Sequence, residues 1–176
     1  MADSKDGDIY WHSPDPRAIF PIDVIKFEKN VIKKIRRGDF KFTIDNNFEN
    51  VILECANREN TWINDDIIET YIELHNMGYA HSIETWKDGN IVGGLYGVAI
   101  GGAFFGESMF NKVSDSSKAA FYFLINHLRE KKYVLLDSQY INDFTEKLGA
   151  ILIPKKRYLK ILDYAISLDR EFYSFS

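Results

Sequence analysis

A glycine-rich stretch at residues 93–110 limits most strongly what this chain can fold into. Two runs of aromatic and branched residues flank Gly101-Gly102, and a glycine pair readily adopts the positive φ angles of a tight hairpin turn. Glycine weakens a strand unless another part of the protein must come close to its backbone. The sequence therefore predicts a β-hairpin whose backbone lies in close contact with other segments.

Glu107 is the acidic residue of this hairpin, and it lies among Phe104, Phe105, Met109 and Phe110. A carboxylate in apolar surroundings requires a partner, and a bound cation or amine would supply one. The alternative is a hairpin that belongs to the core and from which Glu107 points outward.

The size and composition of the chain fit a single domain with a substantial core: 176 residues, of which 45% are hydrophobic and 27% charged. We expect a flexible tail at residues 1–9 and one domain over residues 10–176. The sequence has no apolar run of membrane-spanning length, no signal-peptide pattern, and one cysteine, Cys55, which excludes an internal disulfide and a Cys-based zinc cluster. These features predict a cytoplasmic protein.

The formal net charge of −4 is distributed unevenly, because residues 26–41 form a basic segment. Its basic residues are Lys26, Lys29, Lys33, Lys34, Arg36, Arg37 and Lys41. A local basic face on an acidic protein favours one specific anionic partner over general nucleic-acid affinity. The alternative is a solvated helix face without a partner.

Hydrophobic periodicity and turn residues predict an alternating series of strands and helices. Strands are expected at residues 18–22, 40–44, 81–86, 91–93, on either side of Gly101-Gly102, 133–139 and 149–153. Helices are expected at residues 26–37, 47–55, from Asn64 or Asp65 to Gly78, 114–131, 142–148 and 155–168. This order predicts an α+β fold, a mixed α/β sandwich with a central, mostly antiparallel sheet and helices on both faces.

Asp137 and Gln139 follow an apolar strand and are the sharpest local indication of chemistry. Residues i and i+2 of a strand project to the same side, so both side chains can point into one cleft. Open α/β sheets bind ligands at such strand ends. An acid beside an amide can orient an amine and accept its proton. The alternative is a cap for the helical segment that begins near Asn142.

Other catalytic patterns are absent from the sequence. The four histidines show no metal-ligand spacing, and no nucleophile elbow, phosphate-binding loop or local Cys–His signature occurs. We therefore expect neither a metal site nor a covalent nucleophile.

The order hairpin, helix, strand, helix, strand resembles the second half of the N-acetyltransferase fold. That superfamily binds the pyrophosphate of coenzyme A in a glycine-containing loop at the N-terminus of its central helix. The equivalent segment here, residues 111–118, has no glycine and carries Asp115. Coenzyme A is therefore not the expected donor, although acyl transfer fits the fold.

Several motifs occur together between about residues 9 and 160. The most specific are Ser-Pro-Asp-Pro-Arg at 13–17, Gly-Glu-Ser-Met-Phe at 106–110 and Asp-Ser-Gln at 137–139. With Trp11, Thr-Trp-Ile at 61–63 and Leu-Gly-Ala at 148–150, they resemble the leucyl/phenylalanyl-tRNA–protein transferase family.

The resemblance implies an enzyme that moves leucine or phenylalanine from aminoacyl-tRNA to the N-terminal amine of proteins beginning with Arg or Lys, which marks them for degradation. It implies a fold related to the N-acetyltransferases and no metal or free cofactor, since the aminoacyl-tRNA is the donor. Relatives that transfer leucine to acidic N-termini leave the acceptor open.

The resemblance also implies roles for individual residues. Asp137 and Gln139 would be catalytic, with Gln139 orienting the attacking amine and Asp137 polarising it. The aminoacyl side chain would lie between Leu95, Phe104 and Met109, which requires a kink near Gly106 because Phe104 and Met109 face opposite ways on an ideal strand. The acceptor would contact Glu107, Ser108 and Asn142. The tRNA would contact Trp11, Trp62, Lys26, Lys29, Lys33, Lys34, Arg36 and Arg37.

Two departures from the family pattern accompany the resemblance. The family usually has an N-terminal subdomain of some tens of residues ahead of the Ser-Pro-Asp-Pro-Arg motif, whereas ten residues precede Trp11 in this sequence, so we expect that subdomain to be lacking. In addition, Leu95 and His12 stand where other residues are common in relatives. Two other functions therefore stay open. They are a small-molecule N-acyltransferase with another activated donor, and a non-catalytic module that binds tRNA or N-terminal residues.

Overall fold

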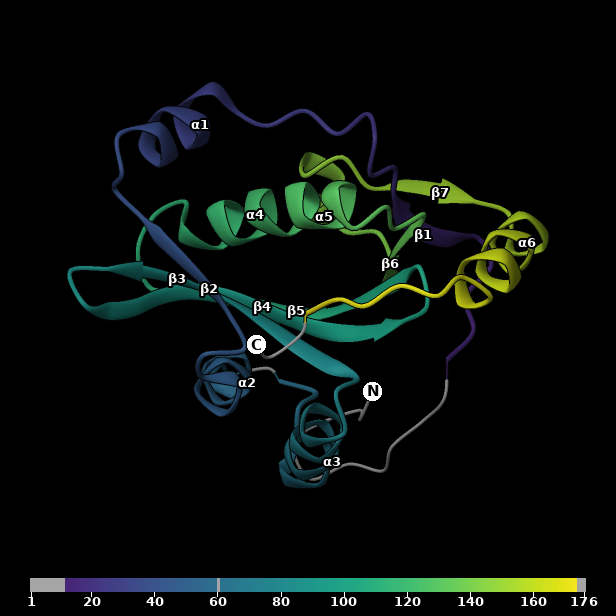
Figure 1. Ribbon diagram of the computed structural model, residues 1–176, viewed down its shortest axis with the longest axis horizontal. Helices are drawn as coiled ribbons and strands as arrows, with labels where there is room; N and C mark the ends of the chain where they lie inside the picture. Colours follow the sequence, from purple (N-terminus) through teal and green to yellow (C-terminus); the bar gives the residue numbers. More distant parts are fainter. Residues whose placement is uncertain (1–11, 60, 174–176) are drawn as a thin grey trace.

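The computed structural model describes residues 12–59 and 61–173 as a seven-stranded sheet with helices on both faces (Figure 1). The strands are β1 (Arg17–Phe20), β2 (Lys41–Ile44), β3 (Ala80–Lys87), β4 (Asn90–Ile100), β5 (Ala103–Asn111), β6 (Leu135–Gln139) and β7 (Ile151–Ile153). The helices are α1 (Lys29–Arg36), α2 (Phe48–Ala56), α3 (Asp65–Asn76), α4 (Ser116–Glu130), α5 (Asp143–Lys147) and α6 (Lys155–Ile166). No helix in these ranges is long and apolar enough to cross a membrane.

The strand order is β2-β3-β4-β5-β6-β1-β7. Neighbouring strands in the described sheet run antiparallel except β5 and β6, which are parallel. The hairpin β4–β5 is followed by α4, β6, α5 and β7, which is the order that the sequence predicted. The predicted α+β class with a mostly antiparallel sheet is confirmed.

The sheet is covered by α4 on one face and by α2 and α3 on the other (Figure 1). Two successive glycines of β4 show how closely both layers pack. A Cβ added at Gly93 would lie 2.4 Å from Ser116 Oγ of α4, and one at Gly94 would lie 3.4 Å from a methyl group of Val51 in α2. The close backbone contact predicted for the glycine-rich hairpin is therefore present on both faces.

Asparagine caps begin three helices where the sequence predicted them. The side chain of Asn47 accepts from the backbone N–H of Asn50, Asn64 accepts from Ile67, and Asn142 caps α5. Each cap satisfies a backbone donor that the first helical turn leaves unpaired. Gly78, with φ of 80°, follows the end of α3 as predicted.

The chain after α6 returns to the sheet and places Phe172 in the core (Figure 1). The Phe172 ring stacks on Phe104 at 5.0 Å and on His81 at 4.5 Å between ring centroids. Its carbonyl oxygen lies 2.7 Å from Nε2 of His127 in α4. The C-terminal segment thus closes one end of the core beneath α4.

Glu84 of β3 is a fully buried carboxylate that joins β2, β3 and the start of α2. It accepts hydrogen bonds from the Thr43 and Ser82 hydroxyls, and the backbone N–H groups of Asn46 and Asn47 lie 3.4 Å from its oxygens. Because a buried charge is tolerated only when it is hydrogen-bonded, these donors form one interdependent unit.

We expect Glu84→Ala to lower the free energy of unfolding by about 2–4 kcal/mol, because it leaves several buried donors unpaired. Urea unfolding followed by circular dichroism measures this loss. Glu73→Ala, which removes an exposed carboxylate of α3, is the matched control and should change stability by less than about 0.5 kcal/mol. Equal stability of the two variants would show that Glu84 does not hold β2, β3 and the start of α2 together.

Candidate active site

The candidate site lies where β5 and β6 separate. Their pairing ends at Phe105 opposite Asp137, and a cavity of about 340 Å³ is lined by the residues that follow in both strands. It reaches toward both layers of helices, since Leu124 of α4 and Arg58 after α2 both border it. The cavity therefore forms where the pairing of the parallel strands β5 and β6 ends.

One half of the cavity is apolar. Its walls are Phe20, Leu95, Met109, Phe121, Leu124, Leu136 and Leu148, all of which face the α4 side of the sheet or the loops beside it. Of the predicted side-chain pocket, Leu95 and Met109 line this cavity. Phe104 is fully buried behind it in the core and stacks on Phe172.

The other half of the cavity is polar and faces α2 and α3. It is bordered by Arg58, Trp62, Tyr96, Glu107 and Ser108. Arg58 is fixed by hydrogen bonds from Nη2 to Ser108 Oγ at 2.7 Å and to the Met109 carbonyl at 3.0 Å. The Tyr96 hydroxyl is buried and has no hydrogen-bond partner among the described residues.

A β-bulge at Glu107 gives both halves of the cavity their shape. Ser108 pairs with Tyr96 and Gly106 pairs with Gly97, so Glu107 is an extra residue on β5. An extra residue reverses the alternation of side chains beyond it. Phe104 and Met109 consequently both face the α4 side, and the kink required near Gly106 is present.

Gly97 is needed opposite this bulge. A Cβ at Gly97 would lie 2.2 Å from the Phe105 carbonyl oxygen, a distance that real side chains do not adopt. The glycine therefore permits the close approach of β4 and β5 that accompanies the bulge.

The Asp137 carboxylate is fully buried and has four strong hydrogen bonds. Oδ1 accepts from Arg17 Nε at 3.0 Å and from the Gln139 backbone N–H at 2.9 Å. Oδ2 accepts from Arg17 Nη2 at 2.6 Å and from the Tyr158 hydroxyl at 2.8 Å. These bonds use the acceptor sites that an ionised carboxylate offers.

Arg17 is the charge partner of Asp137, and its side chain is 13% exposed. Burial acts to lower the pKa of Arg17, but the hydrogen bond and the charge of Asp137 outweigh burial and raise it. The guanidinium also lies 4.9 Å from the centre of the Tyr158 ring. The ion pair joins β1 to β6, and the hydrogen bond from Tyr158 joins α6 to the same carboxylate.

Gln139 has a left-handed backbone conformation, with φ of 57°. The register between β1 and β6 also shifts here, because Ile19 pairs with Asp137 and Ala18 with Gln139. The regular alternation used to place Asp137 and Gln139 on one side therefore does not hold at Ser138. Both residues still border the cavity, because the bond from the Gln139 N–H to Asp137 stabilises the unusual turn.

The carboxyl group of Glu107 borders the polar end of the cavity and is half-buried. Burial raises its pKa to about 7, against a hydrogen bond from the Tyr71 hydroxyl that lowers it. The negative charge of Asp137 raises it further. A cationic ligand beside Glu107 would therefore favour its ionised form.

The structure brings most of the predicted site residues together. Asp137, Gln139, Leu95, Met109, Glu107, Ser108, Asn142 and Trp62 all line one cavity. Asn142 also uses its side-chain oxygen to cap α5, accepting from Phe144 and Thr145. The prediction for Trp11 lies outside the described residues.

Sequence reasoning did not identify the partners that hold the site. No sequence pattern points to Tyr158 or Arg58, and Arg17 is marked only as the last residue of a motif. A lone tyrosine in a C-terminal helix and an arginine in a loop have no local pattern that indicates such contacts. The proline-restricted segment before Arg17 was the available signal, since it fixes the direction in which β1 begins.

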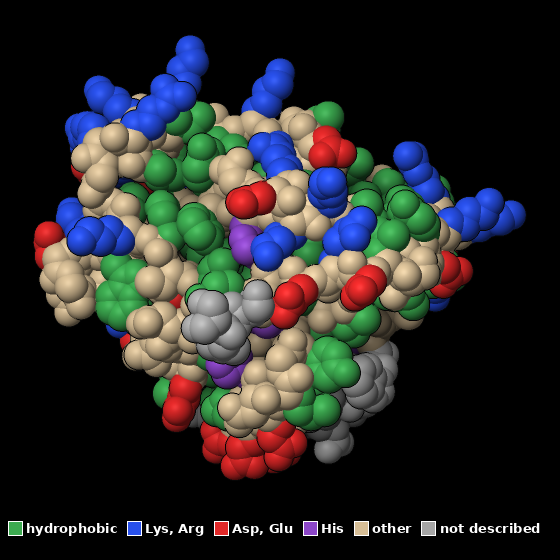
Figure 2. Space-filling view, in the orientation of Figure 1, with side chains coloured by type: hydrophobic (Ala, Val, Ile, Leu, Met, Phe, Trp, Pro, Cys, Tyr) green, Lys and Arg blue, Asp and Glu red, His purple; other side chains and the backbone are tan. Residues whose placement is uncertain are grey.

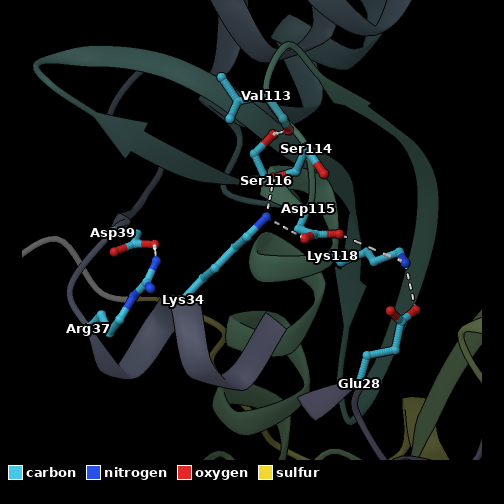
Figure 3. A network of polar contacts seen from close by, with 9 residues as sticks. All are labelled: Glu28, Lys34, Arg37, Asp39, Val113, Ser114, Asp115, Ser116 and Lys118. Carbon is cyan, nitrogen blue, oxygen red and sulfur yellow. Dashed lines mark hydrogen bonds and ion pairs between the residues drawn. The ribbon is translucent and has the colours of Figure 1, made fainter. Parts of the chain in front are cut away.

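The predicted basic face lies on α1 and its flanks, and several of its charges are neutralised locally. Figure 3 shows Lys34 paired with Asp115 at 2.6 Å, next to the Lys118–Glu28 pair, and Arg37 paired with Asp39 at 2.6 Å. Lys26, Lys29, Lys33 and Arg36 are exposed and make no ion pair in the described part of the chain. Figure 2 shows Lys and Arg side chains gathered over this end of the molecule.

The fold and the cavity define a mixed α/β domain with a half-apolar site at a sheet opening. The solved structure titled L-PGS from Bacillus licheniformis is similar in fold, with a TM-score of 0.54 at 13% identity, over 86% of this chain and 65% of that chain. At this identity the similarity concerns the fold alone.

Sequence comparison defines the family. The family model for "Leucyl/phenylalanyl-tRNA protein transferase" matches residues 19–163. A protein of that name from Gloeobacter violaceus is 46% identical over 98% of this chain and 89% of its own length, and one from Chlorobium limicola is 47% identical over 94% and 88%. The chain belongs to the leucyl/phenylalanyl-tRNA–protein transferase family.

The raised pKa of Glu107 predicts a pH dependence of stability. The folded protein holds this proton up to about pH 7, whereas the unfolded chain releases it near pH 4.5. The unfolding free energy should therefore fall by on the order of 2 kcal/mol as the pH rises from about 5 to about 8. Urea unfolding of the wild type and of Glu107→Gln measures this contribution, which the glutamine removes.

The matched control is Glu73→Gln, which changes an exposed carboxylate on α3. This variant should retain the wild-type dependence on pH. If Glu107→Gln and the wild type lost stability equally over this range, the Glu107 carboxyl would be solvated rather than enclosed.

Proposed function

We propose that this protein transfers leucine or phenylalanine from aminoacyl-tRNA to the N-terminal amine of acceptor proteins. Acceptors beginning with Arg or Lys fit best, and the new N-terminus marks them for degradation in the cytoplasm. The observation that carries the proposal is the cavity, in which an apolar half and a polar half meet beside Gln139. Family membership supports the same reaction.

The reaction is aminolysis of an ester. The acceptor nitrogen forms a bond with the carbonyl carbon of the aminoacyl group, the ester C–O bond breaks, and the ribose hydroxyl leaves. The proton lost by the amine is transferred to the ribose oxygen, which leaves as a hydroxyl group. Because the ester is already activated, holding the two reactants in position supplies most of the rate.

Gln139 is the residue that we assign to orient the incoming amine. Its side chain borders the cavity, and its backbone is fixed by Asp137. An amide oxygen can accept a hydrogen bond from the attacking amine while its nitrogen carries no charge that would compete with the substrate.

Asp137 acts through Gln139 in this proposal. Its oxygens already accept from Arg17, Tyr158 and the Gln139 N–H, so no lone pair is left to take the amine proton. We therefore assign it as a positioning residue rather than as the polarising base that the family pattern implies.

The apolar half of the cavity fits the side chain of the transferred residue. Leu95, Met109, Phe121 and Leu124 surround a volume that an unbranched, γ-branched or aromatic side chain can fill. A β-branched side chain is widest near its own backbone and gains less from such a pocket. Phe104 supports the pocket from behind.

The polar half fits the terminal nucleotide and the acceptor. Trp62 offers a ring on which the adenine can stack for roughly 1–3 kcal/mol. Glu107 fits the basic N-terminal residue of the acceptor, because a cation would favour its ionised form.

Aminoacyl-tRNA is favoured over coenzyme A as donor by the N-terminus of α4 (Figure 3). Asp115, at the N-cap, has φ of 71° and carries a carboxylate, which Lys34 of α1 contacts at 2.6 Å. Ser116 Oγ is bonded to the Val92 and Val113 carbonyls. A pyrophosphate at this helix end would have to compete with the Asp115 carboxylate, which already pairs with Lys34.

A transfer assay distinguishes the three functions. The protein is incubated with Leu-tRNA carrying labelled leucine and with peptides that begin with Lys, Arg, Asp or Glu. We expect label on the Lys and Arg peptides. Binding of tRNA without transfer would instead support a non-catalytic module, and transfer from a small acyl donor but not from tRNA would support an N-acyltransferase.

We predict that Gln139→Ala lowers kcat by about 10–100-fold and leaves the Kd for tRNA within about twofold. Gln139→Gly should have the same effect, because glycine adopts the left-handed conformation without strain and also removes the side chain. Steady-state transfer and filter binding measure both quantities. Wild-type activity in the glycine variant would show that the backbone and not the amide is required.

Reversing two unpaired charges of α1 tests its contact with tRNA. We expect Lys29→Glu combined with Lys33→Glu to weaken tRNA binding and to reduce the slope of log K against log salt by about 2, since each phosphate contact contributes roughly 0.9. Binding is measured between about 50 and 200 mM salt. An unchanged slope would identify α1 as a solvated surface.

A further inference from the structure

Helix α6 begins with a cluster of four basic residues that the sequence pattern did not single out. The cluster consists of Lys155, Lys156, Arg157 and Lys160. The last three are exposed, and no member makes an ion pair in the described part of the chain. In Figure 2, blue side chains gather at the end of the molecule where Figure 1 places α6, away from α1.

The position of these charges does not benefit the helix. The N-terminal end of a helix carries a partial positive charge, so cations in the first turn are unfavourable, and α6 has no acidic residue there to compensate. Lys156 and Lys160 are also four positions apart, where like charges repel. In α1, by contrast, Lys33, Lys34 and Arg36 lie in the last turn, where the helix dipole favours them.

The cluster lies close to the site. Tyr158, one position after Arg157, donates a hydrogen bond to Asp137 at 2.8 Å. The backbone N–H of Lys155 donates to Asp15 at 3.0 Å, two residues before Arg17, which also binds Asp137. Lys155 and Tyr158 are three positions apart, a rise of about 4.5 Å along the helix axis. None of the four cations lines the cavity, but the helix that carries them is bonded to Asp137, which does.

We propose that the α6 cluster binds backbone phosphates at the single-stranded 3′ end of the donor tRNA, next to the nucleotide that carries the amino acid. The inference rests on the proposed function, since it assumes that the ester donor is a tRNA. The contact is electrostatic and independent of sequence, because lysine and arginine meet phosphates and not base edges. It is separate from the α1 surface, which lies at the other end of the molecule (Figure 1).

The test neutralises two exposed members with Lys156→Gln and Arg157→Gln. The matched control is Lys87→Gln with Lys132→Gln, which removes two exposed cations that make no ion pair in the described chain. We expect the α6 variant to bind tRNA about 5–10-fold more weakly than the control near 100 mM salt, with a log–log salt slope reduced by about 1.4, the value for two single-strand contacts. The Tm should stay the same or rise slightly, because unfavourable charges leave the helix N-terminus.

A second donor separates this proposal from the proposed function. Leucyl-adenosine carries the ester and the terminal nucleoside but no phosphate, so the α6 variant should use it at the wild-type rate. Loss of transfer from both donors would mean that the substitutions disturb the site, and tRNA binding equal to that of the control would exclude the contact; either result overturns the inference. Failure of the wild type with both donors would refute the proposed function instead.

Discussion

The arrangement of the site depends on one buried carboxylate. Asp137 is removed from water completely, and such a charge is stable only because Arg17 neutralises it and Tyr158 and the Gln139 N–H complete its hydrogen bonds. The partners come from β1, β6 and α6, which are far apart in the sequence. Folding therefore has to bring these three elements into register before the cavity acquires its final shape.

Two irregularities of the sheet open the cavity next to Asp137. The left-handed backbone of Gln139 ends the pairing of β6, and the bulge at Glu107 reverses the direction of side chains in β5. Regular strands would have continued the parallel pair and closed the opening. The resulting cavity is bordered by Gln139, by an apolar wall and by the carboxyl group of Glu107.

Much of the fold could be predicted from local chemistry. Asn47 and Asn64 begin helices because each caps a free backbone donor, and Asp88-Gly89 forms a turn because both residues accept positive φ. The contacts of the site could be predicted only in part. The motif residues reach one cavity, but the Arg17–Asp137 bond spans 120 positions, and no periodicity encodes such a distance. Phe104 joined the core rather than the cavity because Phe172 covers it.

The most direct measurement is the single-turnover rate of transfer from saturating Leu-tRNA by Asp137→Asn. Asparagine has an NH2 donor where the carboxylate oxygen accepts from Arg17 or Tyr158, so Gln139 should lose its fixed position. The rate should then fall by about 100-fold or more, in a protein that remains folded and binds tRNA normally. A rate within threefold or so of the wild type would contradict the central role of this carboxylate.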